Sequence, residues 1–141
     1  MARAIDLLSR REYSRRELTQ RLRPHAQSPE ELAQVLDQLA ERTWQSDQRF
    51  AEQFSRSRAG KYGSLRLRQH LREKGVSGEL IDEALSSQDD LATARAVWQR
   101  KFGTLPDSPQ DKARQARFLA ARGFPPEIIR KILAGRLDDN E

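Results

Sequence analysis

Residues that could perform acid–base or metal chemistry are few in this chain of 141 residues. The only histidines are His25 and His70, and neither has a second histidine at a spacing that suits metal ligation. Asp89 and Asp90 resemble a carboxylate pair, but they precede an apolar stretch where helix capping explains them. The chain has no cysteine and no phosphate loop of the P-loop type. We therefore expect no catalytic residue, no metal, no cofactor and no enzymatic activity.

A concentration of basic side chains is the strongest functional signal. Residues 56–74 contain seven basic side chains and one acid, Glu73. Because like charges repel one another, this density favours a surface that binds an anionic partner over a merely solvated face. A second basic group lies between residues 112 and 122. The candidate partner-binding residues are Arg56, Arg58, Lys61, Tyr62, Arg66, Arg68, Arg72, Lys74, Lys112, Arg117 and Arg122.

Arginine greatly outnumbers lysine among the basic residues. The formal net charge is +5, and of the 26 basic residues 21 are Arg and 5 are Lys. Arginine pairs bidentately with phosphate or carboxylate groups, so the excess suggests nucleic acid or an acidic protein groove as a partner. A genome that encodes Arg in place of Lys is an equally good cause of the ratio.

Aromatic residues are sparse, and most of them occupy positions that suit a core. Tyr62 differs, because it stands between Gly60 and Gly63 ahead of a basic helix, where contact with a partner and packing are equally good explanations. The others lie on helical stripes or at junctions, which favours core packing over base stacking. They are Trp44, Phe50, Phe54, Trp98, Phe102 and Phe118.

The elements that carry these residues recur along the chain. Residues 71–85 (LREKGVSGELIDEAL) align with residues 119–133 (LAARGFPPEIIRKIL) at an offset of 48, and residues 13–36 align with residues 62–85 at an offset of 49. Repetition at a fixed period indicates a repeat architecture. We place three repeats at residues 1–46, 47–89 and 90–141.

Capping signals divide each repeat into three helices. Ser14 with Glu17 and Ser28 with Glu31 form capping boxes, and Ser77, Ser108 and Asp47 are further candidates for the residue that caps a helix start. Glycines after apolar or basic turns mark helix ends. The predicted helices are 3–11, 14–23, 29–43, 47–59, 64–74, 78–86, 90–102, 109–122 and 126–135.

Composition fits thin helical modules better than one large core. Apolar residues make up 36% of the chain, and the mean hydropathy is −0.88. We predict an all-α fold of three tandem three-helix repeats, about nine helices, in an elongated array that is either straight or curved. The sequence has no membrane-spanning apolar run and no signal peptide, so we expect a cytoplasmic protein with no membrane partner. We also expect a monomer, although no sequence feature determines the oligomeric state.

Pairs of short helices joined by a glycine turn also suggest a helix–turn–helix that binds duplex DNA. In repeats one and two, however, the last helix is acidic, which would repel phosphates. Sequence-specific duplex recognition is therefore the weaker hypothesis, and direct nucleic-acid binding stays as the alternative.

Several motifs resemble those of one bacterial family. Residues 56–77 (RSRAGKYGSLRLRQHLREKGVS), with the lead-in from Asp47 to Phe54, are similar to the central motif of the RecX family of RecA regulators. Residues 13–22 resemble its opening motif, and residues 112–124 its closing one. The resemblance covers nearly the whole chain, in order.

This resemblance implies a function that composition does not give. RecX proteins bind the RecA recombinase, chiefly as a filament on single-stranded DNA, and suppress ATP hydrolysis, strand exchange and repressor cleavage. The implied mode is a long protein that lies in the helical groove of the filament. The implied setting is DNA repair, recombination and the SOS response.

Overall fold

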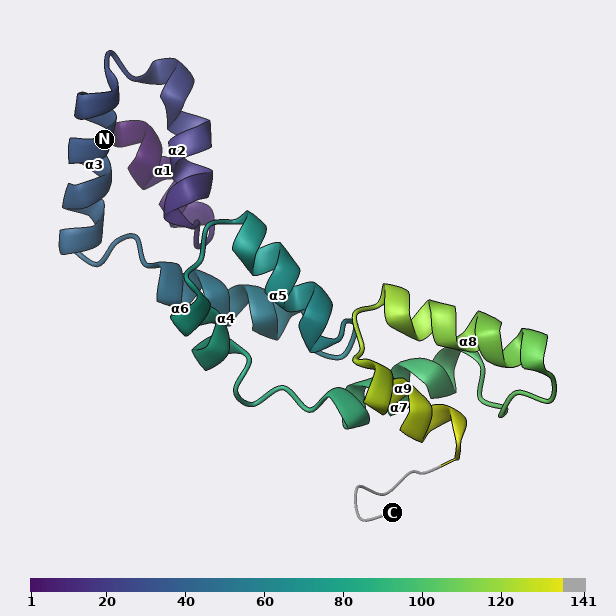
Figure 1. Cartoon of the computed structure of the whole chain (residues 1–141). Coiled ribbons are helices and arrows are strands. Elements are labelled where there is room, and N and C mark those ends of the chain that lie inside the picture. The colour runs from purple at the N-terminus through teal and green to yellow at the C-terminus, as the bar shows by residue number, and fades with distance from the viewer. Residues whose placement is uncertain (136–141) are drawn as a thin grey trace. The chain divides into compact units, whose positions relative to one another are not determined.

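The computed structural model describes residues 1–135, and this range is helical throughout apart from its turns and loops (Figure 1). The predicted all-α class and its nine helices are confirmed within the described range, with ends that differ from the prediction by at most two residues. A short 3-10 helix, η1 (Arg23–His25), was not predicted. The α-helices are α1 (Ala2–Arg10), α2 (Arg15–Leu22), α3 (Pro29–Glu41), α4 (Asp47–Arg58), α5 (Ser64–Glu73), α6 (Gly78–Ala84), α7 (Asp90–Lys101), α8 (Pro109–Ala121) and α9 (Pro126–Leu133).

The helices pack into two compact units. Within the described range, unit 1 contains residues 1–56 and 71–84, and unit 2 contains residues 57–70 and 85–135. The sequence repeat and the packing unit are therefore different divisions of the chain, because α4 and α5 each contribute residues to both units.

The core of unit 1 is formed mainly by α1, α2 and α3, with α2 packed against both of the others. Phe50 and Phe54 are also buried in this unit, with ring centroids 5.7 Å apart. The apolar stripe of α3 faces inward as its spacing predicts. The main core cluster consists of Ala4, Tyr13, Leu18, Leu22, Leu32, Leu36 and Leu39.

The core of unit 2 is built where α9 packs on α7 and α8. One buried polar contact lies inside it: the indole of Trp98 donates to Gln115 Oε1 at 2.8 Å. The amide of Gln115 in turn donates to the carbonyl oxygen of Thr104 at 3.2 Å and to Asp111 at 3.1 Å. These bonds satisfy polar groups that would be costly to bury alone.

The serine caps form largely as predicted. Ser14 and Glu17 form a complete capping box, whereas Ser28 caps α3 without a reciprocal bond from Glu31. Ser77 and Ser108 also accept backbone amides at helix starts.

Asp47 does not cap the helix that it begins, which corrects the prediction. Ser46 Oγ accepts the amide of Arg49 at 3.2 Å and so serves the start of α4. Asp47 instead accepts the backbone amide of Arg15 at 2.9 Å, at the start of α2. Its carboxylate thereby connects two helices of unit 1.

The same connection recurs in unit 2. Asp90 accepts the backbone amide of Ser64 at 2.9 Å, and Gln88 donates to Asp90 at 3.3 Å and to the carbonyl oxygen of Tyr62 at 3.2 Å. Gln45 makes the equivalent bonds in unit 1, to Asp47 at 3.0 Å and to Tyr13 at 3.3 Å. Each Gln-x-Asp segment therefore fixes the backbone of a tyrosine that precedes a helix.

Trp44 departs from the predicted core role. It is 45% exposed, in the connection between α3 and α4, and the Arg42 guanidinium lies 5.1 Å from its ring. Phe102 and Phe118 are half-buried against the core of unit 2, and their rings meet edge to face at 5.4 Å. Within residues 1–135, no helix has both the length and the apolar character needed to cross a membrane.

Candidate partner-binding site

The loop between α4 and α5 positions the predicted Lys61 and Tyr62 side chains. The amide of Lys61 donates to the carbonyl oxygen of Arg58 at 3.2 Å, which closes a turn at the end of α4. Gly60 lies in the left-handed region with a φ of 87° and has open space around it. This turn points the loop toward α8 within unit 2.

Two glycines bring the loop into backbone contact with the end of α8. The amide of Gly63 donates to the carbonyl oxygen of Arg122 at 2.8 Å, and the amide of Leu65 donates to that of Gly123 at 3.0 Å. A Cβ atom at Gly63 would overlap the carbonyl group of Gly123, and one at Gly123 would overlap Arg66. The close approach therefore requires both glycines.

As a result, two guanidinium groups lie close to the Tyr62 ring. The Arg66 guanidinium is 4.5 Å from the ring centroid, and that of Arg122 is 5.7 Å from it. The Arg66 side chain also donates to the carbonyl oxygen of Ala121, and the Arg122 side chain to that of Lys61. These hydrogen bonds hold both guanidinium groups near the Tyr62 ring. Cation–π attraction between each guanidinium group and the ring further fixes their positions.

A cavity of about 240 Å³ opens beside this cluster and is lined mainly by cations. Val97, Phe118 and Gly60 supply its apolar walls. The Arg122 guanidinium lies 5.1 Å from the Phe118 ring, so the same side chain contacts both Phe118 and Tyr62. We call this cavity the basic pocket. The charged residues that line it are Lys61, Arg100, Lys101 and Arg122.

The charges of the basic pocket are not neutralised by ion pairs within the part of the chain that the structure describes. None of its four cations forms an ion pair with a carboxylate among residues 1–135. Lys61, Arg100 and Lys101 are exposed, and Arg122 is half-buried. Concentrated positive charge beside low-dielectric aromatic walls attracts anions strongly. The pocket is therefore suited to bind a phosphate or a carboxylate.

The structure gathers part of the predicted set at this site and leaves the rest elsewhere. The gathered residues are Lys61, Tyr62, Arg66 and Arg122. Those exposed outside the basic pocket are Arg56, Arg72, Lys112 and Arg117. Within the described residues, no contact marks these four exposed residues as a binding surface.

Three predicted residues have internal contacts. Arg58 is half-buried and donates to Ser57 Oγ at 2.9 Å. Arg68 is half-buried and has an interaction partner. Lys74 pairs with Glu17 at 3.3 Å.

Glu17 shows what this pairing does to charge. Burial alone would raise the pKa of Glu17, but hydrogen bonds from Arg11 and from the amide of Ser14, together with the charges of Arg11 and Lys74, outweigh it. The pKa of Glu17 is therefore lowered, and the residue is ionised at neutral pH. Lys74 therefore forms an ion pair with this buried carboxylate within unit 1.

Sequence reasoning missed Arg100, Lys101 and Phe118 as residues that line this cavity. Arg100 and Lys101 end α7, outside the dense basic run, and Phe118 was assigned to the core alone. Their signal was a basic last turn directly before Phe102, a residue whose ring contacts Phe118. That signal becomes clear only once α7 and α8 are known to pack together.

Comparison with known proteins settles the family. Three family models match the chain in order: the first three-helix domain of RecX at residues 1–39, the second at residues 46–85 and the third at residues 88–133. The chain belongs to the RecX family. This confirms the resemblance drawn from the motifs and the three-helix repeat.

Individual RecX proteins match along nearly the whole chain. The regulatory protein RecX of Chromobacterium violaceum is 58% identical over 139 residues, which cover 99% of this chain and 91% of the relative. That of Neisseria meningitidis serogroup A is 46% identical over 141 residues and also covers 99% of this chain, with 92% of the relative.

Solved RecX structures share the fold. A crystal structure of a regulatory protein RecX superposes with a TM-score of 0.81 at 22% identity, over 93% of this chain and 69% of the other. RecX from Lactobacillus salivarius gives a TM-score of 0.81 at 19% identity, over 96% and 92% of the two chains. At these identities the likeness shows the three-dimensional fold alone.

Proposed function

We propose that this chain is a non-enzymatic regulator of RecA that binds the RecA filament on single-stranded DNA. Under this proposal it lies in the helical groove of the filament and suppresses ATP hydrolysis, strand exchange and coprotease activity. It acts in the cytoplasm as a monomer, within DNA repair, recombination and the SOS response. Membership of the RecX family, whose relatives are named regulatory proteins, supports this role.

One structural observation carries the proposal. The basic pocket presents four cations that have no carboxylate partner among residues 1–135, beside the ordered Tyr62. Holding like charges together costs free energy in the isolated protein, because they repel one another. An anionic groove would relieve that repulsion, and a filament that contains DNA offers such a groove.

The test is a titration of the chain into RecA that is hydrolysing ATP on single-stranded DNA. We expect the hydrolysis rate to fall to a plateau as the filament becomes saturated, while the chain alone hydrolyses no ATP. Co-sedimentation with the filament in the same buffer measures occupancy. Filaments that bind the chain but keep their full rate would refute inhibition, and a lack of co-sedimentation would refute binding.

Direct contact with a nucleic-acid strand is the second candidate function. It is favoured by the closeness of Arg122 to the rings of both Tyr62 and Phe118, because single strands are bound by cations and aromatic faces together. With labelled oligo-dT, the affinity should then fall with salt, with a log–log slope of about −0.7 per neutralised phosphate. A flat salt response, or no binding without RecA, would remove this candidate.

A further inference from the structure

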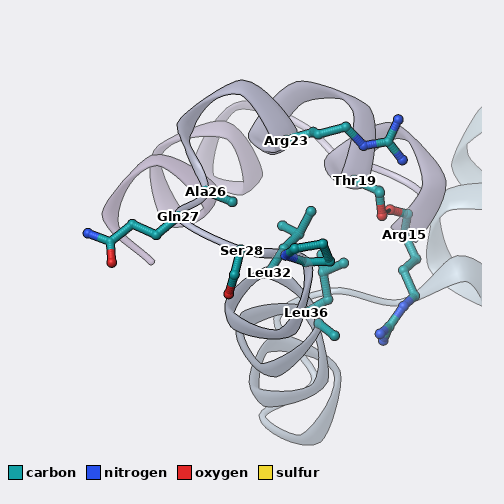
Figure 2. Close-up of a pocket in the computed structure, with 10 residues that line it drawn as sticks. Arg15, Thr19, Arg23, Ala26, Gln27, Ser28, Leu32 and Leu36 are labelled. Carbon is teal, nitrogen blue, oxygen red and sulfur yellow. Dashed lines mark hydrogen bonds between the residues drawn. The ribbon is translucent and has the colours of Figure 1, made fainter.

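Unit 1 contains a groove between α2 and α3. It shares no lining residue with the basic pocket. Its volume is about 420 Å³. Figure 2 shows Thr19 of α2 and Arg23 of η1 on one side of this space, and Leu32 and Leu36 of α3, with Ser28 directly before that helix, on the other. None of the described residues that line the groove is acidic.

The floor of the groove is apolar. Leu32 and Leu36 are 8% and 4% exposed, so they belong to the core and present only their outer edges to the groove. Pro29, the first residue of α3, and Ala26, which follows η1, extend this surface. Concave sites of a few hundred Å³ with apolar walls accept one apolar group well. The floor therefore suits an aliphatic or aromatic side chain.

The polar wall provides cationic donors. The hydroxyl of Thr19 donates to the carbonyl oxygen of Arg15 at 2.8 Å, whereas Ser28 Oγ accepts the amide of Glu31 at 3.1 Å. Arg15 forms one ion pair, with Asp37 at 2.8 Å. Arg23 is exposed and has no ion pair with any residue in the described range. An occupant of this groove must therefore bring acceptors and negative charge.

We propose that the groove binds an acidic segment of a protein partner, which inserts one apolar side chain between α2 and α3 and places a carboxylate against Arg23. Charge complementarity selects an acidic occupant, since the lining is basic. The apolar floor selects a peptide over a nucleic-acid strand, because no aromatic residue is available for base stacking among the lining residues. This proposal does not depend on the proposed action on RecA.

The experiment titrates the isotope-labelled full chain with synthetic peptides and follows backbone amides by NMR. The probe is a short peptide with one Leu flanked by Asp and Glu; one control replaces the Leu by Ser, and another replaces the acids by Lys. We expect saturable shifts along α2 and α3 with the first peptide only. No saturable shift there, or equal shifts with the Lys peptide, would overturn the proposal. Shifts that grow with chain concentration alone would assign the groove to a second copy and also overturn it.

Matched variants locate the site. Ala33 lines the groove and is exposed, whereas Ala40 is exposed on the same helix outside the groove. Ala33→Trp should fill the space and weaken peptide binding about tenfold, and Ala40→Trp should leave it unchanged. Arg23→Glu should weaken binding about tenfold, while Arg130→Glu on α9 should not. Circular dichroism checks folding. Equal affinities within either pair would contradict the proposed site.

Discussion

Asp90 accepts a hydrogen bond from the backbone amide of Ser64 at 2.9 Å, across 26 residues of sequence. Asp47 accepts that of Arg15 at the same distance across 32 residues. In each case a carboxylate at the beginning of one helix satisfies an amide at the start of an earlier helix, which no helical carbonyl can reach. The repeat thus conserves a long-range contact, although the number of intervening residues changes.

Removal of the Asp90 carboxylate should destabilise the protein. Asp90→Ala leaves the amide of Ser64 unpaired and removes one acceptor of Gln88. We expect a loss of about 1–2 kcal/mol in the free energy of unfolding, measured with urea. Asp107→Ala, at an exposed aspartate, should change stability by less than about 0.5 kcal/mol. Equal effects of the two changes would contradict the connecting role of Asp90.

The close approach of Gly63 to Gly123 gives a second prediction. Gly63→Ala places a Cβ atom on the Gly123 carbonyl group, so the loop must move and its hydrogen bonds must lengthen. We expect about 2 kcal/mol or more of destabilisation in urea unfolding. Gly78→Ala is the control, because nothing lies within 4 Å of the added Cβ. A Gly63 variant as stable as the Gly78 variant would show that the approach is not tight.

Local signals explain why the helices could be predicted from the sequence. Ser14 and Ser28 mark helix starts through hydrogen bonds that span three residues, and Gly75 and Gly123 mark helix ends through their own backbone conformation. These interactions are complete within a few residues of sequence. A pattern of residue types therefore suffices to find them.

The candidate site could be predicted only in part, because its geometry depends on tertiary packing. Lys61 and Tyr62 stood out through their glycine neighbours, whereas Arg100 and Lys101 join the basic pocket only because α7 lies beside α8 in unit 2. The pattern of charged residues in the sequence could not show that Lys74 forms an ion pair with Glu17. A run of basic residues in the sequence indicates a positively charged surface. It does not show which of those residues form ion pairs within the protein.

The lowered pKa of Glu17 predicts a pH-dependent stability. A carboxyl whose pKa is lower in the folded state contributes its stabilisation fully above its ordinary, unfolded pKa, and loses it as the pH falls through the folded value. Glu17→Gln should therefore cost about 1–3 kcal/mol at pH 7 and progressively less in acid. Urea unfolding at several pH values measures this, with Glu41→Gln at an exposed position as the control. A cost that stays constant between pH 7 and acid would contradict the role of the ionised form.

Inhibition of the RecA ATPase by charge-reversal variants tests the central claim most directly. Lys61→Glu with Lys101→Glu reverses two cations of the basic pocket, and Arg21→Glu with Arg130→Glu makes the same change in net charge at exposed residues outside it. Circular dichroism and urea unfolding first establish that both variants are folded. We predict that the pocket variant needs about tenfold more protein for half-inhibition than the unaltered chain, and that the control needs the same amount as the unaltered chain. Equal inhibition by a folded pocket variant would contradict the claim that these cations bind the filament.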